Sequence, residues 1–288
     1  MSSLAKELVE SGIHFGQRRS NWNPRMAPYI HTTRNQVHVI DVRETIKGLL
    51  LAKRFIQKLV SEGKEICFVG TKRQARGSIE ARCAEAKMPY VTERWLGGTL
   101  TNFRTIRDRL RRLEELESLQ QSGEIRNYSK KMESQLTREQ KKIFRNLNGI
   151  RGMTKLPGAL VAIDTGREVN ALQEARNLGI PTICLIDTDG NPELADIPIP
   201  GNDDSMRAID IVVRELCAAV TEGRSQRAES AATSGDREGD GMRGDANAET
   251  APAGRRRSSR SQFRARGRAE DTDTGSAPRA ETAPVENA

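Results

Sequence analysis

The sequence predicts an α/β fold built on a doubly wound, mainly parallel sheet. Three short apolar runs, each bounded by Gly, Pro or Asp, carry this prediction, because continuous apolar runs are typical of strands buried on both faces. They are residues 65–70, 159–164 and 181–187. Helical patterns separate the runs, and this alternation implies right-handed crossovers around one sheet, as in flavodoxin-like and Rossmann-like folds.

Each predicted helix has an apolar face at helical spacing, and turn residues mark where helices stop. Gly63 follows the first helix, Met88-Pro89 the second, and Gly179 with Pro181 the third. The helices are residues 43–62, 73–87, 167–177 and 205–222. Residues 36–42 alternate between apolar and polar side chains, which predicts a further strand nearer an edge.

Residues 103–150 interrupt the alternation and predict an inserted antiparallel helical hairpin with a coiled-coil-like seam. Apolar residues recur every three or four positions, and Gly123 breaks the first helix. We therefore expect a sheet domain formed by residues 1–102 and 151–223, from which the hairpin projects. Parts of the hairpin's outer face are basic, which indicates either a solvated surface or a contact with a partner.

Residues 224–288 predict a disordered tail rich in Arg, Ala and Gly. The tail contains a single aromatic residue, Phe263, and too little apolar surface to offset the entropy of ordering it. The arginines between Arg255 and Arg268 form a cluster that could attract RNA. The tail as a whole is almost neutral, so a solvated spacer explains it equally well.

Composition excludes several protein classes. No run approaches the roughly 18 apolar residues of a membrane-spanning helix, and residues 1–20 lack the apolar region of a signal peptide. The four cysteines lie far apart without a Cys-x-x-Cys pair, as expected of buried free thiols in a reducing cytoplasm. The net charge of +8, most of it in residues 1–223, favours a polyanionic partner.

The usual catalytic motifs are missing. The sequence has no Walker A motif, no Gly-x-Gly-x-x-Gly after a strand and no Gly-x-Ser-x-Gly. The loop Ile186–Gly190 resembles that of magnesium-dependent phosphohydrolases, which would act through Asp187 and Asp189. A capped turn, or a cation between Asp187 and Asp203 or Asp204, would explain the same residues. We predict no catalytic residue, no cofactor and no metal, and keep the phosphohydrolase as the alternative.

Many of the polar and charged residues that suit binding to a partner lie in residues 12–34, a segment without regular periodicity. This segment interleaves arginines with aromatic residues: Arg18, Arg19, Arg25, Arg34, Phe15, Trp22 and Tyr29. Such mixtures suit RNA, because cations neutralise phosphates while aromatic rings and guanidinium planes stack on exposed bases. At least one of the three aromatic side chains is expected to pack the segment onto the sheet domain instead.

Two other segments suit an RNA backbone. Residues 70–77 follow a predicted strand and place three cations at the start of a helix, where phosphate oxygens are favoured. Residues 93–104 combine two arginines and small polar side chains with Gly97-Gly98, which permits close approach of a partner. Thr101 or Asn102 could equally cap the helix that follows.

The motifs of these segments resemble the bacterial small-subunit ribosomal protein S2 family. The resemblance covers residues 4–223 in the expected order, and Arg94–Asn102 (RWLGGTLTN) is its most specific part. The other matching stretches are Gly12–Gly16, Trp22–Pro24, Met26, Tyr29-Ile30, Val69–Ala75, Leu156-Pro157, Glu168-x-x-Ala171, Gly179–Pro181, Asp187-Thr188 and Pro198–Asp204. Family members often end near Gly223, whereas this sequence continues.

The resemblance implies a structural protein of the small ribosomal subunit, acting in the cytoplasm. Its family members have a sheet domain with a protruding helical hairpin, bind ribosomal RNA between the head and body of the subunit, and help to hold ribosomal protein S1, which captures messenger RNA. The RNA contacts carried over by motif are Arg18, Arg19, Trp22, Asn23, Arg25, Lys72, Arg73, Arg94, Asn102 and Arg104. A further alternative is an adaptor that docks a protein on the hairpin seam through Leu110 and Leu113.

Overall fold

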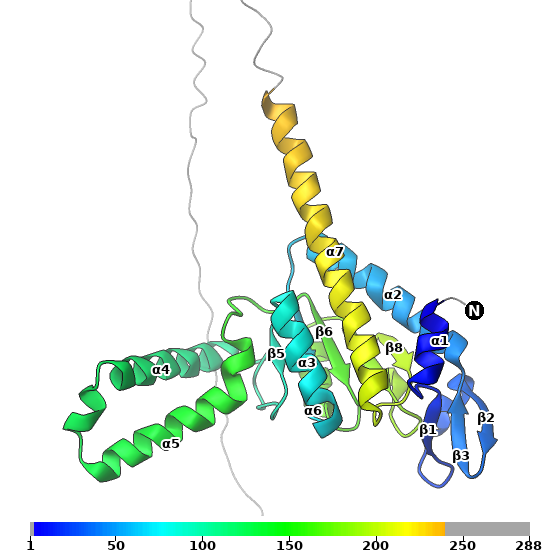
Figure 1. Cartoon of the computed structure of the whole chain (residues 1–288), viewed down its shortest axis with the longest axis horizontal. Coiled ribbons are helices and arrows are strands. Elements are labelled where there is room, and N and C mark those ends of the chain that lie inside the picture. Colours follow the sequence, from blue (N-terminus) through cyan, green and yellow to red (C-terminus); the bar gives the residue numbers. More distant parts are fainter. Residues whose placement is uncertain (1–2, 240–288) are drawn as a thin grey trace, which may run out of the picture. The chain divides into compact units, whose positions relative to one another are not determined.

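The computed structural model describes residues 3–239, and its central element is a five-stranded parallel sheet (Figure 1). In spatial order the strands are β5 (Tyr90–Val91), β4 (Ile66–Val69), β6 (Ala159–Ile163), β7 (Thr182–Ile186) and β8 (Ile197–Pro200). The chain passes from β4 outward to β5 and then lays down β6 on the other side of β4, which is the flavodoxin-like strand order. The predicted doubly wound parallel sheet is therefore confirmed.

The strands β4, β6 and β7 are buried throughout, as their continuous apolar runs predicted. Successive side chains alternate between two cores, because neighbours along a strand point to opposite faces. In β4, Ile66 and Phe68 belong to one core, whereas Cys67 and Val69 belong to the other.

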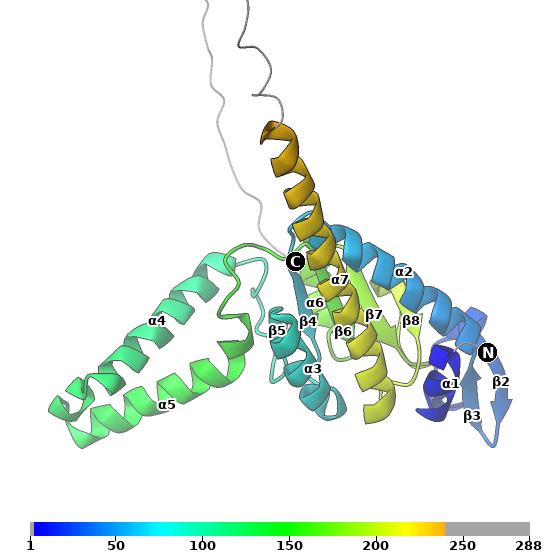
Figure 2. The same ribbon diagram turned by 45° about the horizontal axis from the view of Figure 1, so that its top comes forward.

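Helices cover both faces of the sheet. The helices on the first face are α2 (Val42–Ser61), α3 (Arg73–Ala86) and α7 (Met206–Gly239). Figure 2 shows α2 and α7 crossing this face beside each other. On the second face lie α6 (Val169–Asn177) and the base of the helical hairpin. The sheet is thus the middle layer of three.

Helix α2 approaches the sheet most closely at Gly48. A Cβ at this position would lie 2.5 Å from the carbonyl oxygen of Pro198 in β8, so the close contact requires glycine. One turn earlier, the Thr45 hydroxyl donates to the carbonyl oxygen of Pro200 at 2.6 Å. The Asp41 side chain caps the first turn by accepting from the Arg43 N–H. These contacts fix α2 against the edge strand β8.

The N-terminal region forms a second sheet, which differs from the prediction. Helix α1 (Ser3–Glu10) is followed by β1 (Phe15–Arg18), the 3₁₀ helix η1 (Pro24–Tyr29), β2 (Ile30–Arg34) and β3 (Val37–Ile40). The strands pair antiparallel in the order β1-β3-β2. Residues 36–42 do contain a strand, but it pairs with the aperiodic segment 12–34 and not with the parallel sheet. We name this unit the N-terminal sheet.

Sequence patterns did not identify two edge strands of the parallel sheet. Strand β5 has two residues, too few to show a period. Strand β8 reads Ile-Pro-Ile-Pro, and proline usually argues against a strand because it lacks the N–H that the ladder needs. At an edge, one side of the strand has no neighbour, so β8 tolerates its prolines.

The inserted segment is a pair of helices, as predicted. Helix α4 (Phe103–Gln121) and helix α5 (Lys130–Leu147) are joined through η2 (Glu124–Asn127), and η3 (Asn148–Ile150) returns the chain to the sheet. Leu110, Leu113 and Leu116 of α4 are buried in the seam. Because Leu110 and Leu113 are covered, they offer no surface on which a partner protein could dock.

The last helix is longer than predicted. Helix α7 continues to Gly239, so the first part of the predicted tail 224–288 is helical, while residues 240–288, with the arginine cluster, lie outside the described residues. Within the described part of the chain, no helix is long and apolar enough to span a membrane. All four cysteines are free and buried, as expected: Cys67, Cys83, Cys184 and Cys217.

Candidate nucleic-acid interface

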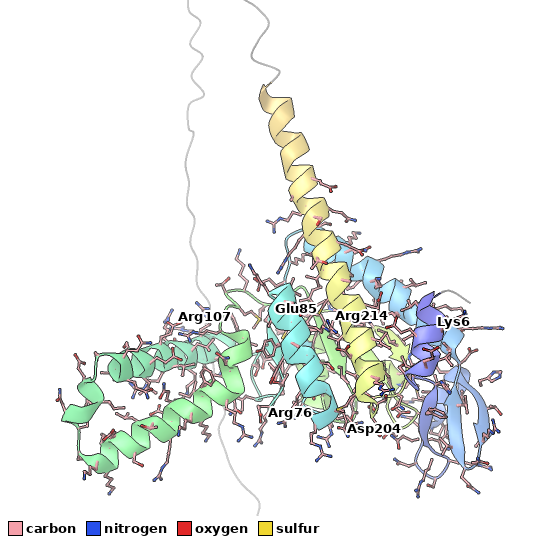
Figure 3. All side chains as sticks on the ribbon, viewed as in Figure 1. Lys6, Arg76, Glu85, Arg107, Asp204 and Arg214 are labelled. Atoms are coloured by element: carbon pink, nitrogen blue, oxygen red, sulfur yellow. The ribbon has the colours of Figure 1, made fainter. Side chains whose placement is uncertain are left out.

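The carboxyl edge of the parallel sheet, where the strands end, gathers many of the polar residues singled out in the sequence. Figure 3 labels Arg76 and Asp204 along this edge. Lys72, in the turn after β4, is only 8% exposed, and its ammonium lies 2.7 Å from Asp203 Oδ1 and 2.6 Å from Asp204 Oδ1. Both aspartates follow β8. The lysine therefore joins two turns that lie far apart in the sequence.

The carboxylates at this edge are bonded within the protein. Asp187, after β7, is buried and accepts hydrogen bonds from the Thr188 N–H and the Gln17 amide. Burial raises the pKa of Asp187 to about 6, and burial, opposed by Lys72, raises the pKa of Asp203 to about 7. Carboxylate oxygens of Asp187, Asp203 and Asp204 lie within 4.8 Å of one another. The Lys72 ammonium supplies positive charge among them, so the cluster does not by itself indicate a metal.

The N-terminal sheet is attached to this edge by hydrogen bonds. The Gln17 N–H donates to Thr188 Oγ1, and its side-chain amide donates to Asp187 and Asp204. A Cβ on Gly16 would lie 2.6 Å from Thr188 Cγ2, so glycine is needed for β1 to lie this close to the turn after β7. The N-terminal sheet and the carboxyl-edge turns therefore form one continuous surface.

The outer face of the N-terminal sheet carries two free cations and an aromatic ring. Arg18 in β1 and Arg34 in β2 are both paired with Val37 of β3, and side chains of directly paired residues point to the same face. Phe15, which is paired with Val39, lies further along this face and is 52% exposed. Among the described residues, neither arginine has an ion-pair partner. We call Phe15, Arg18 and Arg34 the outer face.

The three aromatic residues of this segment differ in exposure. Tyr29 packs against the second core of the sheet domain, which meets the expectation that at least one aromatic side chain holds the segment in place. Trp22 rests on His38, with ring centroids 5.1 Å apart, and remains 37% exposed. Trp22 and Phe15 therefore both keep ring surface that an RNA base could contact.

The loop between β5 and α4 is held in place by one half-buried carboxylate of α6, that of Glu174. Glu174 Oε1 accepts from the Trp95 indole and the Gly98 N–H, and Glu174 Oε2 accepts from the Leu100 and Thr101 N–H groups and the Thr101 hydroxyl. Burial alone would raise the pKa of Glu174, but these hydrogen bonds hold it below its usual value. The distinctive motif of residues 94–102 thus takes its shape from Glu174.

The predicted RNA-binding residues occupy different environments. Of the predicted cations, Arg18, Arg19, Arg73, Arg94 and Arg104 are exposed and have no ion-pair partner among the described residues. Arg25 is exposed but lies 2.6 Å from Glu193, and Lys72 is held by its aspartates. The Asn23 side chain caps η1, and Asn102 accepts from the Thr105 hydroxyl at the start of α4. RNA contact by each of these residues stays a prediction.

Sequence reasoning missed Glu174. It counted Arg34 among the cations of residues 12–34 that suit RNA, but did not include it in the RNA contacts carried over by motif. Glu174 lies between buried neighbours on α6, Leu172 and Ala175, but its hydrogen-bond donors come from a loop about 75 residues away, and no local signal marks such a contact. The position of Arg34 on Arg18's face of the sheet follows only from the pairing of Arg34 in β2 with Val37 in β3.

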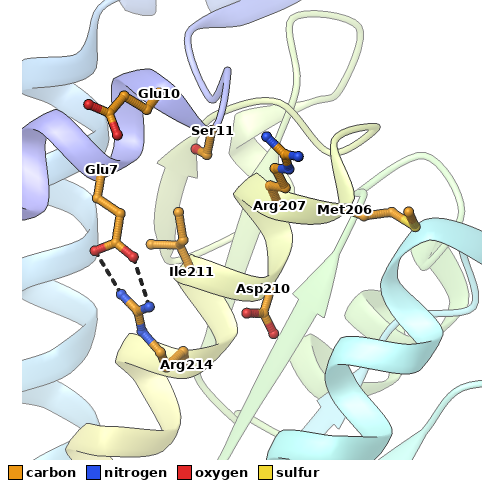
Figure 4. A pocket seen from close by; sticks show the side chains of 8 residues that line it. All are labelled: Glu7, Glu10, Ser11, Met206, Arg207, Asp210, Ile211 and Arg214. Atoms are coloured by element: carbon orange, nitrogen blue, oxygen red, sulfur yellow. Dashed lines mark hydrogen bonds and ion pairs between the residues drawn. The ribbon is translucent and has the colours of Figure 1, made fainter.

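A separate hollow of about 410 Å³ lies between α1 and the start of α7 (Figure 4). The Arg214 guanidinium donates to both oxygens of Glu7, at 2.8 and 2.9 Å, and Asp210 accepts two hydrogen bonds from Arg82 of α3. Glu7, Asp210 and Arg214 on its walls thus link helix to helix. We interpret this hollow as a packing seam that joins α1, α3 and α7.

Comparison with known proteins gives one consistent result. A family model described as ribosomal protein S2 matches residues 8–223. The small ribosomal subunit protein uS2 of Rhodopirellula baltica is 53% identical over 231 residues, which cover 80% of this chain and 89% of the relative. The uS2 proteins of Rippkaea orientalis and Mycobacterium bovis are 46% and 45% identical, over 79% and 77% of this chain and 85% and 78% of their own lengths.

These matches decide between the functions that the sequence left open. The S2 proteins are non-enzymatic components of the small ribosomal subunit, so the phosphohydrolase acting through Asp187 and Asp189 is wrong. The buried, hydrogen-bonded state of Asp187 agrees with this result. On the extent and level of identity, this chain belongs to the ribosomal protein S2 (uS2) family and has a structural role in translation within the small ribosomal subunit.

Proposed function

We propose that this protein binds ribosomal RNA of the small subunit through the outer face of its N-terminal sheet and the adjoining carboxyl-edge loops. The observation that carries the proposal is the register that sets Arg18 and Arg34 on either side of Val37 on one face of the sheet, with Phe15 further along β1. Neither guanidinium has an acidic partner in the described residues, so both are available to phosphate. The exposed ring of Phe15 is available to stack on a base.

The footprint extends along the carboxyl edge to Arg73 and Arg94 and then to Arg104 at the start of the hairpin. All three side chains are exposed and have no ion-pair partner among the described residues. Lys72 and Asn23 belong to the same surface, and we assign RNA contacts to both. Each side chain also bonds within the protein, Lys72 to Asp203 and Asn23 to the Arg25 N–H. Trp22, Arg19, Arg25 and Asn102 complete the proposed set.

Electrostatic docking has a measurable consequence. If about six phosphates are neutralised, the logarithm of the association constant should fall with the logarithm of salt concentration at a slope of roughly −4 to −5. Filter binding of small-subunit ribosomal RNA in a potassium chloride series tests this. A flat salt dependence would remove the support for the proposal.

A matched pair of variants tests the location. In R18A/R34A both guanidinium groups of the outer face are removed, which should weaken RNA binding and reduce the salt slope by about 1.5 to 2. The control R54A/K58A removes the same charge from the exposed side of α2 and should change the slope little. Equal effects of the two double variants would show that net charge, and not the outer face, determines binding.

We propose in addition that the protein helps to hold ribosomal protein S1. Family membership supports this, together with an apolar surface that RNA does not require. Leu50 and Leu51 of α2 are 45% and 57% exposed and lie among Arg43, Lys47 and Arg54. Small subunits reconstituted with L50S/L51S should retain less S1 than wild type, with RNA binding unchanged. Unchanged retention of S1 would exclude this face.

A further inference from the structure

A cleft of about 210 Å³ opens where the strand order of the parallel sheet reverses, between the turns that follow β4 and β6. In open α/β sheets this reversal point is where the fold leaves room for a ligand. We call it the switch cleft. Its walls are Thr71, Glu93, Arg94, Trp95, Arg167, Glu168, Asn170 and Ala171.

The floor of the switch cleft contains a carboxylate with one oxygen unused. Glu168 is 1% exposed, and its Oε1 accepts from both the N–H and the hydroxyl of Thr71, at 2.8 and 2.7 Å. Its Oε2 accepts no hydrogen bond from any described residue. Burial raises the pKa of Glu168. Oε2 is not among the fully buried, unpartnered side-chain atoms of the described residues, so it is reached from the cleft and can accept from a donor that enters there.

The remaining walls make the cleft attractive to an anion. Arg94 and Arg167 are exposed. Among the described residues Arg94 has no ion-pair partner, and Arg167 is paired only with Asp164, at 3.9 Å. The other carboxylate in the wall, Glu93, is already bound by Arg76 and Arg145. A ligand that enters therefore meets two guanidinium groups outside and a hydrogen-bond acceptor inside.

We propose that the switch cleft receives one ribose and its phosphate from an RNA strand, with the 2′-hydroxyl donating to Glu168 Oε2 and the phosphate held by Arg94 and Arg167. This proposal deepens the proposed RNA binding and rests on it. A ribonucleotide unit is the component of RNA that carries a hydroxyl donor close to an anion. In nucleotide-binding α/β folds an acidic side chain likewise accepts from a ribose hydroxyl.

Size and charge argue against other occupants. The cleft is smaller than the roughly 300–1,000 Å³ of typical cofactor pockets, so a dinucleotide does not fit inside it. A lysine or arginine from a neighbouring protein would satisfy Glu168 Oε2, but Arg94 and Arg167 would repel it. The 2′-hydroxyl is also the group that distinguishes RNA from DNA, so the proposed contact predicts discrimination between the two.

The test compares a short oligouridylate RNA with its 2′-deoxy counterpart on the full-length protein. Wild type should bind the RNA about tenfold more tightly, the usual worth of one hydrogen bond to a charged group. In E168Q the amide oxygen still accepts from Thr71, but an NH₂ group replaces the open oxygen, so the charge-assisted bond to the 2′-hydroxyl is lost and the RNA preference should fall severalfold. A purely structural role of Glu168 would leave the ratio of the two affinities unchanged.

The arginines are tested separately. R94A and R167A should each weaken binding of both strands severalfold and lower the salt slope by about one. R176A, at the other end of α6, removes the same charge from an exposed position and serves as the matched control. If R176A weakens binding as much as R94A and R167A do, the phosphate contact is overturned.

The outcomes separate this inference from the proposed function. Equal affinity of wild type for the two strands, with a normal salt slope, overturns the switch cleft and leaves RNA binding by the outer face intact. If neither oligonucleotide binds although ribosomal RNA does, the switch cleft is overturned. If ribosomal RNA also fails to bind, RNA binding itself fails, and uridine monophosphate is then titrated against its 2′-deoxy form in W22F, where Trp95 in the cleft wall is the only remaining tryptophan. Absence of a response specific to the ribonucleotide in that titration overturns the cleft as well.

Discussion

The Lys72 ammonium lies 2.7 Å from the Asp203 carboxylate and so links the turn after β4 to the turn after β8. Asp204, at 2.6 Å, and Asp164, at 3.9 Å, lie beside the same lysine. Gln17 joins this group from the N-terminal sheet by hydrogen bonds to Asp187 and Asp204. At the end of the sheet where related α/β enzymes hold a substrate, this protein places a charge network of its own. The network holds together the turns from which the proposed RNA-binding surface is built.

Replacing Lys72 should destabilise the domain. K72M leaves the buried Asp203 carboxylate without its cation, and breaking such a buried pair typically costs about 3–5 kcal/mol. Urea denaturation should show this loss in the free energy of unfolding. The neighbouring R73M removes an exposed charge and should stay within about 0.5 kcal/mol of wild type. Equal stability of K72M and wild type would contradict the structural role of the ion pair.

Asp187 should make a contribution to stability that falls as pH rises from about 4 toward 7. Its pKa is raised from 3.8 to about 6 in the folded protein, so the folded state binds the proton more tightly than the unfolded chain does. The stabilisation is complete below the unfolded pKa and is lost as pH rises through the folded pKa, a difference of about 3 kcal/mol. D187N should flatten the pH dependence of the unfolding free energy; an unchanged curve would refute the assignment.

Glu174 should be essential to the loop of residues 94–102. In E174Q an NH₂ group faces backbone donors that need an acceptor, which should cost about 2–3 kcal/mol. Because hydrogen bonds lower the pKa of Glu174, its contribution is present at neutral pH and disappears as pH falls through the folded pKa. Urea unfolding, monitored by Trp95 fluorescence in W22F, measures the loss. The exposed neighbour Gln173 provides the control, Q173A.

Gly16 and Gly77 should respond in opposite directions to alanine. In G16A the new Cβ would meet Thr188 Cγ2 at 2.6 Å, which should push the N-terminal sheet away from the edge and weaken RNA binding. In G77A, within α3, the Cβ meets nothing within 4 Å, so the helix should gain about 0.5–1 kcal/mol. Thermal unfolding and filter binding of both variants check this; a neutral G16A would show that the close approach is dispensable.

The sequence predicted those elements whose signal is local. The buried strands β4, β6 and β7 are continuous apolar runs, and α2 has its apolar stripe and Gly63, so composition and period were sufficient. The N-terminal sheet was missed as a unit because its three strands are short and mostly polar on one face, and their pairing is visible only in three dimensions.

The candidate site was predictable in residue type but not in arrangement. Cations mixed with aromatic residues pointed to residues 12–34, yet only the register shows that Arg18 and Arg34 share a face. Lys72 and Arg73 are indistinguishable by sequence pattern, but Lys72 is buried in an ion pair with Asp203, whereas Arg73 is exposed. Pairing of this kind joins residues more than a hundred positions apart, which no local pattern encodes.

The hydrogen bond from Gln17 to Asp204 sets a condition on when the protein becomes competent during its synthesis. The N-terminal strand leaves the ribosome first, but its anchoring partners after β7 and β8 are made almost two hundred residues later. Until these partners emerge, the nascent N-terminal sheet cannot dock on the carboxyl edge of the parallel sheet, so Arg18 and Arg34 have no fixed position relative to that edge. The segment that is translated first therefore acquires its working geometry among the last, once the domain is essentially complete.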